Sequence, residues 1–554
     1  MGDIKEWTLM FYFASDNPLA ASIVSQLKSI KQAGFHPDAN VIAQFDPQTE
    51  GTPTHIFDVN SVDKINARNL RIPYRVGVDR DAAIPTLVTD KLWGKTRSRN
   101  GGLVTDQIRK SLKAQGLRYQ PTDLPATKSG TKDEPSPRKS LQSFLRLCYE
   151  KYPARHYVLF ILGHGLVVGN DIFLFDEHAA DEHSLNLSNL GKLLRAFKRA
   201  VEKRRGKFEL VSFHSCSMSA MEVAYELQGT ANYMLASQGP AFVGSWPYRQ
   251  ILMRLFNDLV IGKKEIKKTF KVVLDGCLEN SYDFQLAGFS FDVTLCDLTK
   301  IGQVRQPMKK LSGALQKALK NSLARELILL SHWEAQSYWQ ETYVDLYDFC
   351  LRLDAKCKYV EGDTKKAVAD FQEAWPKVMA LLDPGDENVV IHSRFAGPAY
   401  QYSHGLSVFF PWSRPVDDKF WPDGYDSYRF RNTDWRRFLE RYFARTMRNP
   451  RGSEVGRAKR EGPVPVPTLE QNLLEEITSS GLTAAGQLSK SGGSDATGSS
   501  SKAGGTDPTG GPKSGGTDPT GDFAGPAIKN FPSYTRDAEP QVNAKARSAR
   551  AKRR

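Results

Sequence analysis

The feature that most constrains the fold is an unbroken apolar run that leads into a histidine flanked by glycines. Tyr157–Leu162 contains only apolar residues, and the tripeptide Gly-His-Gly centred on His164 follows it directly. A second, largely apolar run, Phe208–Phe213, leads in the same way to Cys216. Runs of this kind are typical of strands buried on both faces, as in parallel sheets. The carboxyl ends of such strands meet at one edge, where active-site crevices form.

A histidine and a cysteine that leave neighbouring strands at one edge can serve as a base and a nucleophile. An imidazole that accepts the proton of a thiol converts it to the reactive thiolate, and the imidazolium can then protonate a departing amine. The backbone N–H groups of Gly165 and Cys216 are candidates for stabilising an oxyanion. The spacing in Met218–Gln228 predicts a helix beside the cysteine, whose positive end would lower the thiol pKa. A core cysteine and a loop histidine are the structural alternatives, but the shared position of His164 and Cys216 at strand ends favours catalysis.

Six ordered segments resemble the clostripain-like cysteine peptidases, which share the caspase–gingipain type of fold. The segments are Trp7–Ala20, Tyr157–Gly165, Leu210–Leu227, Ala231–Tyr248, Tyr343–Phe349 and His404–Trp412. The resemblance implies an α/β fold with a mostly parallel sheet flanked by helices, followed by a helical and mixed C-terminal half. It also implies a cysteine endopeptidase that acts on polypeptides, with His164 as base and Cys216 as nucleophile. The 52-residue separation between these two is close to that in caspases.

The predicted substrate pocket departs from the family pattern. Family members that cleave after arginine or lysine carry an aspartate two residues before the nucleophile, where this chain has His214. The resemblance implies a second acidic residue in Ala231–Tyr248, yet that segment contains no Asp or Glu. A buried guanidinium needs a carboxylate partner, so a preference for a basic P1 residue is in doubt. The alternative is an inactive scaffold of the same fold that recruits partners through its basic tail. The candidate pocket residues are His214, Ser237, Gln238 and Trp246.

No metal ion or cofactor is required by the sequence. A polar cluster at His178, Asp181, Glu182 and His183 lacks CxxC or HExxH spacing, so we interpret it as an exposed loop and not as a zinc site. Calcium assists some relatives, so the resemblance allows it, but the chain has no DxDxDG loop that would support it. Gly163, Gly165 and Gly169, which follow the run Tyr157–Leu162, depart by one position from a dinucleotide-binding fingerprint.

Composition constrains the compartment and the partners. The six cysteines are dispersed, which suits a reduced compartment, and neither a signal peptide nor a transmembrane segment is recognisable. We therefore expect a cytoplasmic protein. The formal net charge is +14, and part of that excess lies in the terminal stretch AKARSARAKRR. Such a tail predicts weak contact with nucleic acid or acidic surfaces, with added solubility as the simpler interpretation.

Three regions differ in their residue patterns. Residues 1–248 alternate strand and helix patterns, which predicts βαβ units and a parallel sheet, with a surface insertion at about 93–138. Residues 249–448 are predicted to form the C-terminal half of the peptidase unit from helices and strands. Residues 449–554 are rich in Gly, Ser, Thr and Pro and are predicted to be largely disordered.

The periodicity also places individual elements. The predicted strands are Trp7–Phe13, Val41–Phe45, His156–Leu162, Phe208–Phe213, Tyr233–Ser237 and Leu406–Phe410. The predicted helices are Ala20–Ala33, Lys139–Lys151, Leu187–Lys203, Met218–Gln228, Ile301–Ala324, Thr364–Leu382 and Asp434–Thr446.

Overall fold

The computed structural model describes two main parts of the chain. These are residues 4–58 and 136–447, together with residues 86–87. Outside the description lie residues 1–3, 18, 20–22, 24–25, 28, 31–32, 34–35, 47–53, 59–85, 88–135, 166–172, 175, 177–182, 242, 280–288, 340, 416–420 and 448–554. The tail at 449–554 and nearly all of the insertion at 93–138 therefore fall outside the described residues.

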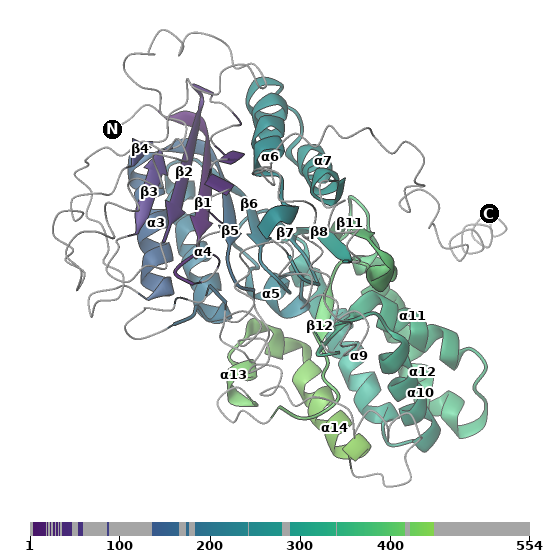
Figure 1. The fold of residues 1–554 in the computed structure, drawn as a ribbon. Helices are drawn as coiled ribbons and strands as arrows, with labels where there is room; N and C mark the ends of the chain where they lie inside the picture. Colours follow the sequence, from purple (N-terminus) through teal and green to yellow (C-terminus); the bar gives the residue numbers. More distant parts are fainter. Residues whose placement is uncertain are drawn as a thin grey trace, which may run out of the picture.

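A nine-stranded sheet forms the centre of the described part (Figure 1). Its order is β11-β8-β7-β6-β5-β1-β2-β3-β4. The strands are β1 (Lys5–Phe13), β2 (Ala39–Phe45), β3 (His55–Asp58), β4 (Thr86–Leu87), β5 (Ala154–Leu162), β6 (Lys207–His214), β7 (Tyr233–Ala236), β8 (Phe291–Asp297) and β11 (Val390–Ala396). The five central strands, β7, β6, β5, β1 and β2, pair in parallel with their neighbours within this group. The pairings outside this group, β11 with β8, β8 with β7, β2 with β3 and β3 with β4, are antiparallel. The predicted α/β class with a mostly parallel sheet is confirmed.

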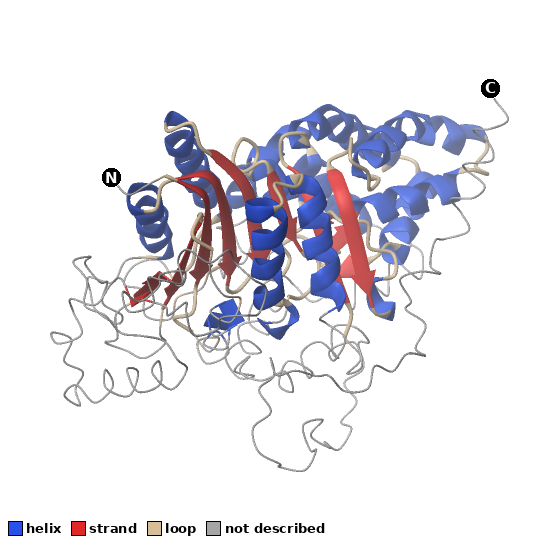
Figure 2. Ribbon diagram, turned by 90° about the horizontal axis from the view of Figure 1, so that it is seen from above, coloured by secondary structure: helices blue, strands red, loops and turns tan. Residues whose placement is uncertain are grey.

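Helices cover both faces of this sheet (Figure 2). They are α3 (Pro137–Lys151), α4 (Leu187–Lys203) and α5 (Met221–Glu226) on one face, and α6 (Tyr248–Leu255) and α7 (Ile266–Glu279) on the other. Successive side chains of β1 point to opposite faces, so Met10 joins the α3 and α4 side while Phe11 packs with α6 and α7. Both faces of the central strands are therefore buried, which explains their continuous apolar sequences.

The second region adds a helical layer and a small sheet beside the main sheet (Figure 1). Its helices are α9 (Arg305–Ala318), α10 (Ser322–Glu334), α11 (Leu346–Cys357), α12 (Gly362–Leu382), α13 (Asp423–Asp426) and α14 (Trp435–Met447). The small sheet has the order β12 (Ser407–Phe409), β10 (Tyr343–Asp345), β9 (Ser337–Tyr338). Strands β8 and β11 of the main sheet also come from this region. The boundary proposed at residue 248 stays a prediction.

Most element predictions match the structure within a few residues, and two helices differ. The predicted helix Met218–Gln228 begins only at Met221. The predicted helix Ile301–Ala324 is a short 3₁₀ turn, then α9, then a break before α10. Asn321 starts the new helix α10 as its N-cap, because its side chain accepts a hydrogen bond from Ala324 N at 2.9 Å. Of the predicted helix at 20–33, the described residues 23, 26, 27, 29 and 30 are helical.

Candidate active site

The register of β5 and β6 places the two predicted catalytic residues at equivalent positions on one sheet edge. These strands run parallel, and Leu162, the last residue of β5, pairs with His214, the last residue of β6. His164 follows Leu162 by two residues, and Cys216 follows His214 by two. Both side chains therefore emerge just beyond the carboxyl ends of adjacent strands, where α/β proteins form their binding crevices.

The loop that carries His164 lies directly against the loop that carries Cys216. A Cβ atom added to Gly165 would lie 1.8 Å from the carbonyl oxygen of Cys216 and 2.5 Å from its carbonyl carbon and its nitrogen. No side chain fits at this distance, so the glycine after the histidine is needed for the close approach of the two backbones. The structure therefore brings His164, Gly165 and Cys216 together.

His164 is a buried, neutral imidazole. Its side chain is only 4% exposed, and its Nε2 atom has no hydrogen-bond partner among the described residues. Burial lowers the pKa of His164 to about 4, because the charged imidazolium loses its hydration there. At neutral pH this ring therefore carries an unprotonated nitrogen that is able to accept a proton.

Cys216 differs from the other cysteines in its exposure. It is half-buried, whereas Cys148, Cys277, Cys296, Cys350 and Cys357 are buried. The backbone N–H of Ala241 donates a hydrogen bond to the Cys216 sulfur at 3.4 Å. The next residue, Ser217, has a left-handed φ of 56°, and its N–H donates to the carbonyl of Gly239 at 3.2 Å. This sharp turn keeps the sulfur at the surface of the sheet edge.

The predicted helix dipole beside the cysteine needs a correction. Helix α5 begins at Met221, five residues after Cys216, and has only six residues. The residues between them form a turn, because Ser217 takes a left-handed conformation and Ser219 N donates to Ser237 O at 2.8 Å. The positive end of the helix does not start at the sulfur, and the field within the first turn of a helix falls off steeply.

Two of the candidate pocket residues form an aromatic stack beneath this edge. The rings of His214 and Trp246 lie 4.8 Å apart and are nearly parallel, at 7°. The Nδ1 atom of His214 lies 3.0 Å from the hydroxyl of Tyr248, and both His214 and Trp246 are buried. The position two residues before Cys216 is thus occupied by a buried imidazole packed on an indole.

The other two candidates, Ser237 and Gln238, support a loop next to the cysteine. The Ser237 hydroxyl donates to the carbonyl of Gly239 at 3.2 Å. The amide of Gln238 donates to Asp345 at 2.9 Å, and its oxygen accepts from Gly405 N at 3.0 Å. Both side chains are buried, and their role toward a substrate stays a prediction.

Sequence reasoning missed the carboxylate that holds this loop. Asp292, in β8, accepts hydrogen bonds from Gln238 N at 2.7 Å and from Gly239 N at 2.8 Å. Burial, and to a lesser extent the charge of Asp345, raise the pKa of Asp292 to about 7, against the effect of the two hydrogen bonds. No motif marks this residue, since it belongs to a strand far from the cysteine in sequence. This strand was not assigned from the sequence, so no sequence signal pointed to Asp292.

Metal binding finds no support among the described residues. Within the described ranges, no group of three or more His, Cys, Asp or Glu side chains could hold a metal ion. Three residues of the predicted polar loop, His178, Asp181 and Glu182, lie outside the description. Calcium therefore stays an expectation from the family resemblance. In the same described ranges, no helix has the length and apolarity needed to cross a bilayer.

Comparison with known families decides the identity of the chain. The model of the clostripain family, peptidase family C11, matches residues 123–442, which is more than half of the sequence. The chain belongs to the clostripain family. This match includes β5, β6 and the segments that carry His164 and Cys216, so the clostripain-like resemblance read from the sequence is confirmed. No curated protein sequence matches the chain significantly.

Solved structures of C11 proteases also align with this clostripain-family chain at low identity. An inactive zymogen C11 protease from Parabacteroides distasonis is 16% identical, with 78% of this chain and 99% of that chain covered and a TM-score of 0.45. A secreted C11 cysteine protease from Bacteroides thetaiotaomicron is 15% identical, with coverages of 74% and 94% and a TM-score of 0.43. The same type of protease in complex with an irreversible peptide inhibitor is 13% identical, with coverages of 78% and 99% and a TM-score of 0.45.

Proposed function

We propose that this clostripain-family protein is a cysteine endopeptidase in which His164 and Cys216 form the catalytic dyad. The observation that carries the proposal is the matched position of the two residues beyond β5 and β6, with Gly165 pressed against the backbone of Cys216. A buried base beside the most exposed cysteine of the described chain provides the two groups that acyl transfer requires.

The neutral state of His164 sets the order of proton transfers. The imidazole accepts the thiol proton of Cys216, and the sulfur forms a bond to the scissile carbonyl carbon. The carbonyl oxygen becomes an oxyanion, for which the backbone N–H groups of Gly165 and Cys216 are the proposed donors. When the C–N bond breaks, the imidazolium gives its proton to the leaving amine. Water, activated by the same imidazole, then hydrolyses the acyl-enzyme.

The stack of His214 on Trp246 supports a P1 preference for uncharged side chains. A guanidinium or ammonium group needs a desolvated carboxylate partner, and neither His214 nor the loop to Tyr248 provides one. We therefore expect substrates with apolar or neutral polar P1 residues.

A peptide library with diverse P1 residues tests the function. We expect the parent protein to cleave it, and the Cys216→Ala variant to lose at least about 10³-fold in kcat/KM, since the nucleophile is gone. The matched control is Cys357→Ala, which removes a buried thiol at the end of α11. A Cys216→Ala protein as active as the parent would overturn the dyad. A parent that cleaves nothing, with or without added calcium, would favour the inactive scaffold.

A further inference from the structure

Two backbone N–H groups of the loop that follows β7 donate hydrogen bonds to a single buried carboxylate, that of Asp292. Asp292 Oδ2 accepts the N–H of Gln238 at 2.7 Å, and Asp292 Oδ1 accepts the N–H of Gly239 at 2.8 Å. Asp292 is 1% exposed, so neither bond competes with water. A carboxylate that binds two successive N–H groups fixes both the position and the direction of that backbone.

The same loop contacts the nucleophile from its other side. The carbonyl of Gly239 accepts the N–H of Ser217 at 3.2 Å, and the N–H of Ala241 donates to the Cys216 sulfur at 3.4 Å. The two N–H groups that Asp292 holds and the N–H that reaches the sulfur are thus only two to three residues apart. A displacement of Gly239 would move the donor at Ala241 with it.

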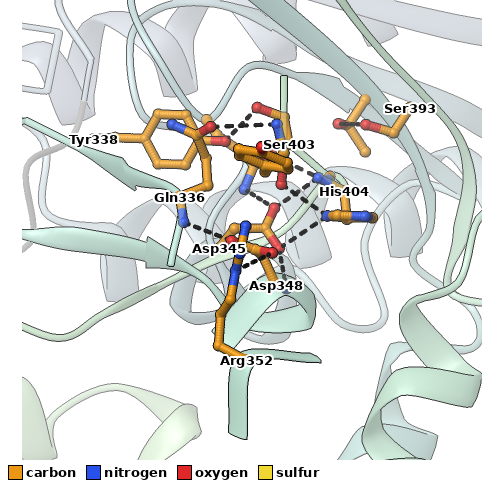
Figure 3. A network of polar contacts seen from close by, with 12 residues as sticks. Gln336, Tyr338, Asp345, Asp348, Arg352, Ser393, Ser403 and His404 are labelled. Carbon is orange, nitrogen blue, oxygen red and sulfur yellow. Dashed lines mark hydrogen bonds and ion pairs between the residues drawn. The ribbon is translucent and has the colours of Figure 1, made fainter. Parts of the chain in front are cut away.

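A buried polar network fixes this loop to the C-terminal half of the protein. Gln238 bonds Asp345, which also accepts from His404 N at 2.7 Å and caps α11 by accepting from Asp348 N at 2.9 Å. Arg352 in turn donates to Asp348 at 3.2 Å. Figure 3 shows Asp345, Asp348, Arg352 and His404 converging in this network. The loop is therefore held by carboxylates from two strands, Asp292 of β8 and Asp345 at the end of β10.

We propose that Asp292 is a positioning residue for Cys216, which holds the loop Ser237–Ala241 so that the Ala241 N–H is directed at the sulfur. This inference rests on the proposed function of Cys216 as nucleophile. A backbone N–H aimed at a thiolate stabilises the anion by a charge-assisted hydrogen bond and so lowers the thiol pKa. This donor takes the place of the helix dipole that the sequence predicted and the structure does not supply.

The rate of alkylation of Cys216 by iodoacetamide, followed from pH 5 to 10, tests this role directly. In Asp292→Asn one acceptor oxygen becomes an NH₂ group that opposes a backbone N–H. We expect the pH midpoint of alkylation to rise by about one unit, which corresponds to a tenfold loss of thiolate at neutral pH. The control, Asp297→Asn, alters a buried carboxylate at the far end of β8 and should keep the parent midpoint. A folded Asp292→Asn protein with the parent profile would refute the proposal.

If Asp292→Asn does not fold, substitutions at Gly239 and Tyr400 test whether the loop Ser237–Ala241 sets the thiol pKa of Cys216. A Cβ atom on Gly239 would lie 2.6 Å from the ring of Tyr400, so Gly239→Ala forces the loop and this ring apart without changing a carboxylate. We expect the same upward shift in the alkylation midpoint. All three nearest atoms belong to Tyr400, so the double variant Gly239→Ala/Tyr400→Ala should recover the profile of Tyr400→Ala alone. A Gly239→Ala midpoint equal to that of the parent contradicts the role of the loop.

The two proposals fail in different ways in these experiments. Alkylation reports the state of the Cys216 thiol whether or not any peptide is cleaved. A parent without peptidase activity but with a midpoint that shifts in Asp292→Asn would overturn the proposed function and leave the positioning role intact. Where cleavage is seen, Asp292→Asn should lower kcat, because it displaces the Ala241 N–H that donates to the nucleophile.

Discussion

Among the glycines in the described part of the chain, Gly165 has the least room for a side chain, and it links the two halves of the proposed dyad. In Gly165→Ala the new Cβ would overlap the carbonyl oxygen of Cys216, at 1.8 Å, so the two loops must separate. A displacement of about 1 Å at a reacting group costs roughly 10²-fold in rate, and we expect at least that loss in kcat/KM.

The matched control for this substitution is Gly276→Ala, in the last part of α7. A Cβ there meets nothing within 4 Å, and alanine favours the helix over glycine by up to about 1 kcal/mol. This variant should keep its activity and unfold at a slightly higher temperature. Equal activity of Gly165→Ala and the parent would mean that the two loops are not in the contact described.

His164 makes a second prediction at the residue scale, which concerns stability and pH. Its pKa in the folded state, about 4, lies below the value of 6.5 for an exposed histidine, so the unfolded chain binds the proton first. The stability that depends on the neutral ring is therefore present above pH 6.5 and is lost as the pH falls through 4. The full difference amounts to about 3 kcal/mol.

Urea unfolding at pH 7.5 and pH 4 measures this difference. The parent should lose more free energy of unfolding between these two pH values than His164→Gln does, by about 2 to 3 kcal/mol. The glutamine keeps a polar side chain of similar size and does not titrate. Identical losses in the two proteins would show that His164 is not buried as a neutral ring.

At the scale of elements, the break between α9 and α10 shows where periodicity misleads. The apolar spacing continues through Ile301–Ala324, so the sequence predicts one helix. The structure interrupts it because Asn321 prefers to cap a new helix by accepting from Ala324 N. Local side-chain hydrogen bonding overrides periodicity here, and a period-based prediction does not include it.

Removal of this cap gives the third prediction. Asn321→Ala should lower the free energy of unfolding by about 1 kcal/mol, as is usual for the loss of an N-cap. Lys320→Ala, at the neighbouring exposed position, should change it by less than about 0.5 kcal/mol. Thermal or urea unfolding distinguishes the two, and equal effects would argue against a cap at Asn321.

Helix α5 supplies the fourth prediction through a buried carboxyl group. Glu222 accepts from Phe409 N at 3.1 Å and from the Tyr425 hydroxyl at 2.6 Å, which joins α5 to β12 and α13. Its second oxygen has no partner among the described residues. Burial raises the pKa of Glu222 from 4.5 to about 7, so the folded protein holds a proton that the unfolded chain releases earlier.

The sign of this effect is opposite to that of His164. The stability contributed by the protonated Glu222 is present below pH 4.5 and is lost as the pH rises through 7, by about 3 kcal/mol in all. Between pH 5 and 8.5, Glu222→Gln should therefore lose less free energy of unfolding than the parent. Glu202→Gln, at an exposed position of α4, should lose as much free energy of unfolding over this pH range as the parent does. Parallel behaviour of all three proteins would rule out a buried, titrating Glu222.

For the whole molecule, the sequence predicted the parts of the fold that carry long apolar signals. The central strands β1, β2, β5, β6 and β7 were recognisable because both of their faces are buried. Strands β8 and β11 were not assigned. They pair with each other although about 100 residues separate them in the chain, and polar residues such as Asp292 and Thr294 interrupt the apolar pattern of β8. The same limit applies to the site. His164 and Cys216 follow strong strand signals, whereas Asp292 acts through three-dimensional contacts that no local pattern records.

The most direct test of the account is covalent labelling of Cys216 by an electrophilic peptide probe with an uncharged P1 residue. The account predicts that Cys216 is labelled in the parent and that a matching peptide substrate slows the reaction. It also predicts that His164→Ala reduces the labelling rate at least about 100-fold. A parent in which Cys216 stays unlabelled, or a His164→Ala variant labelled as fast as the parent, would contradict the proposed catalytic pair.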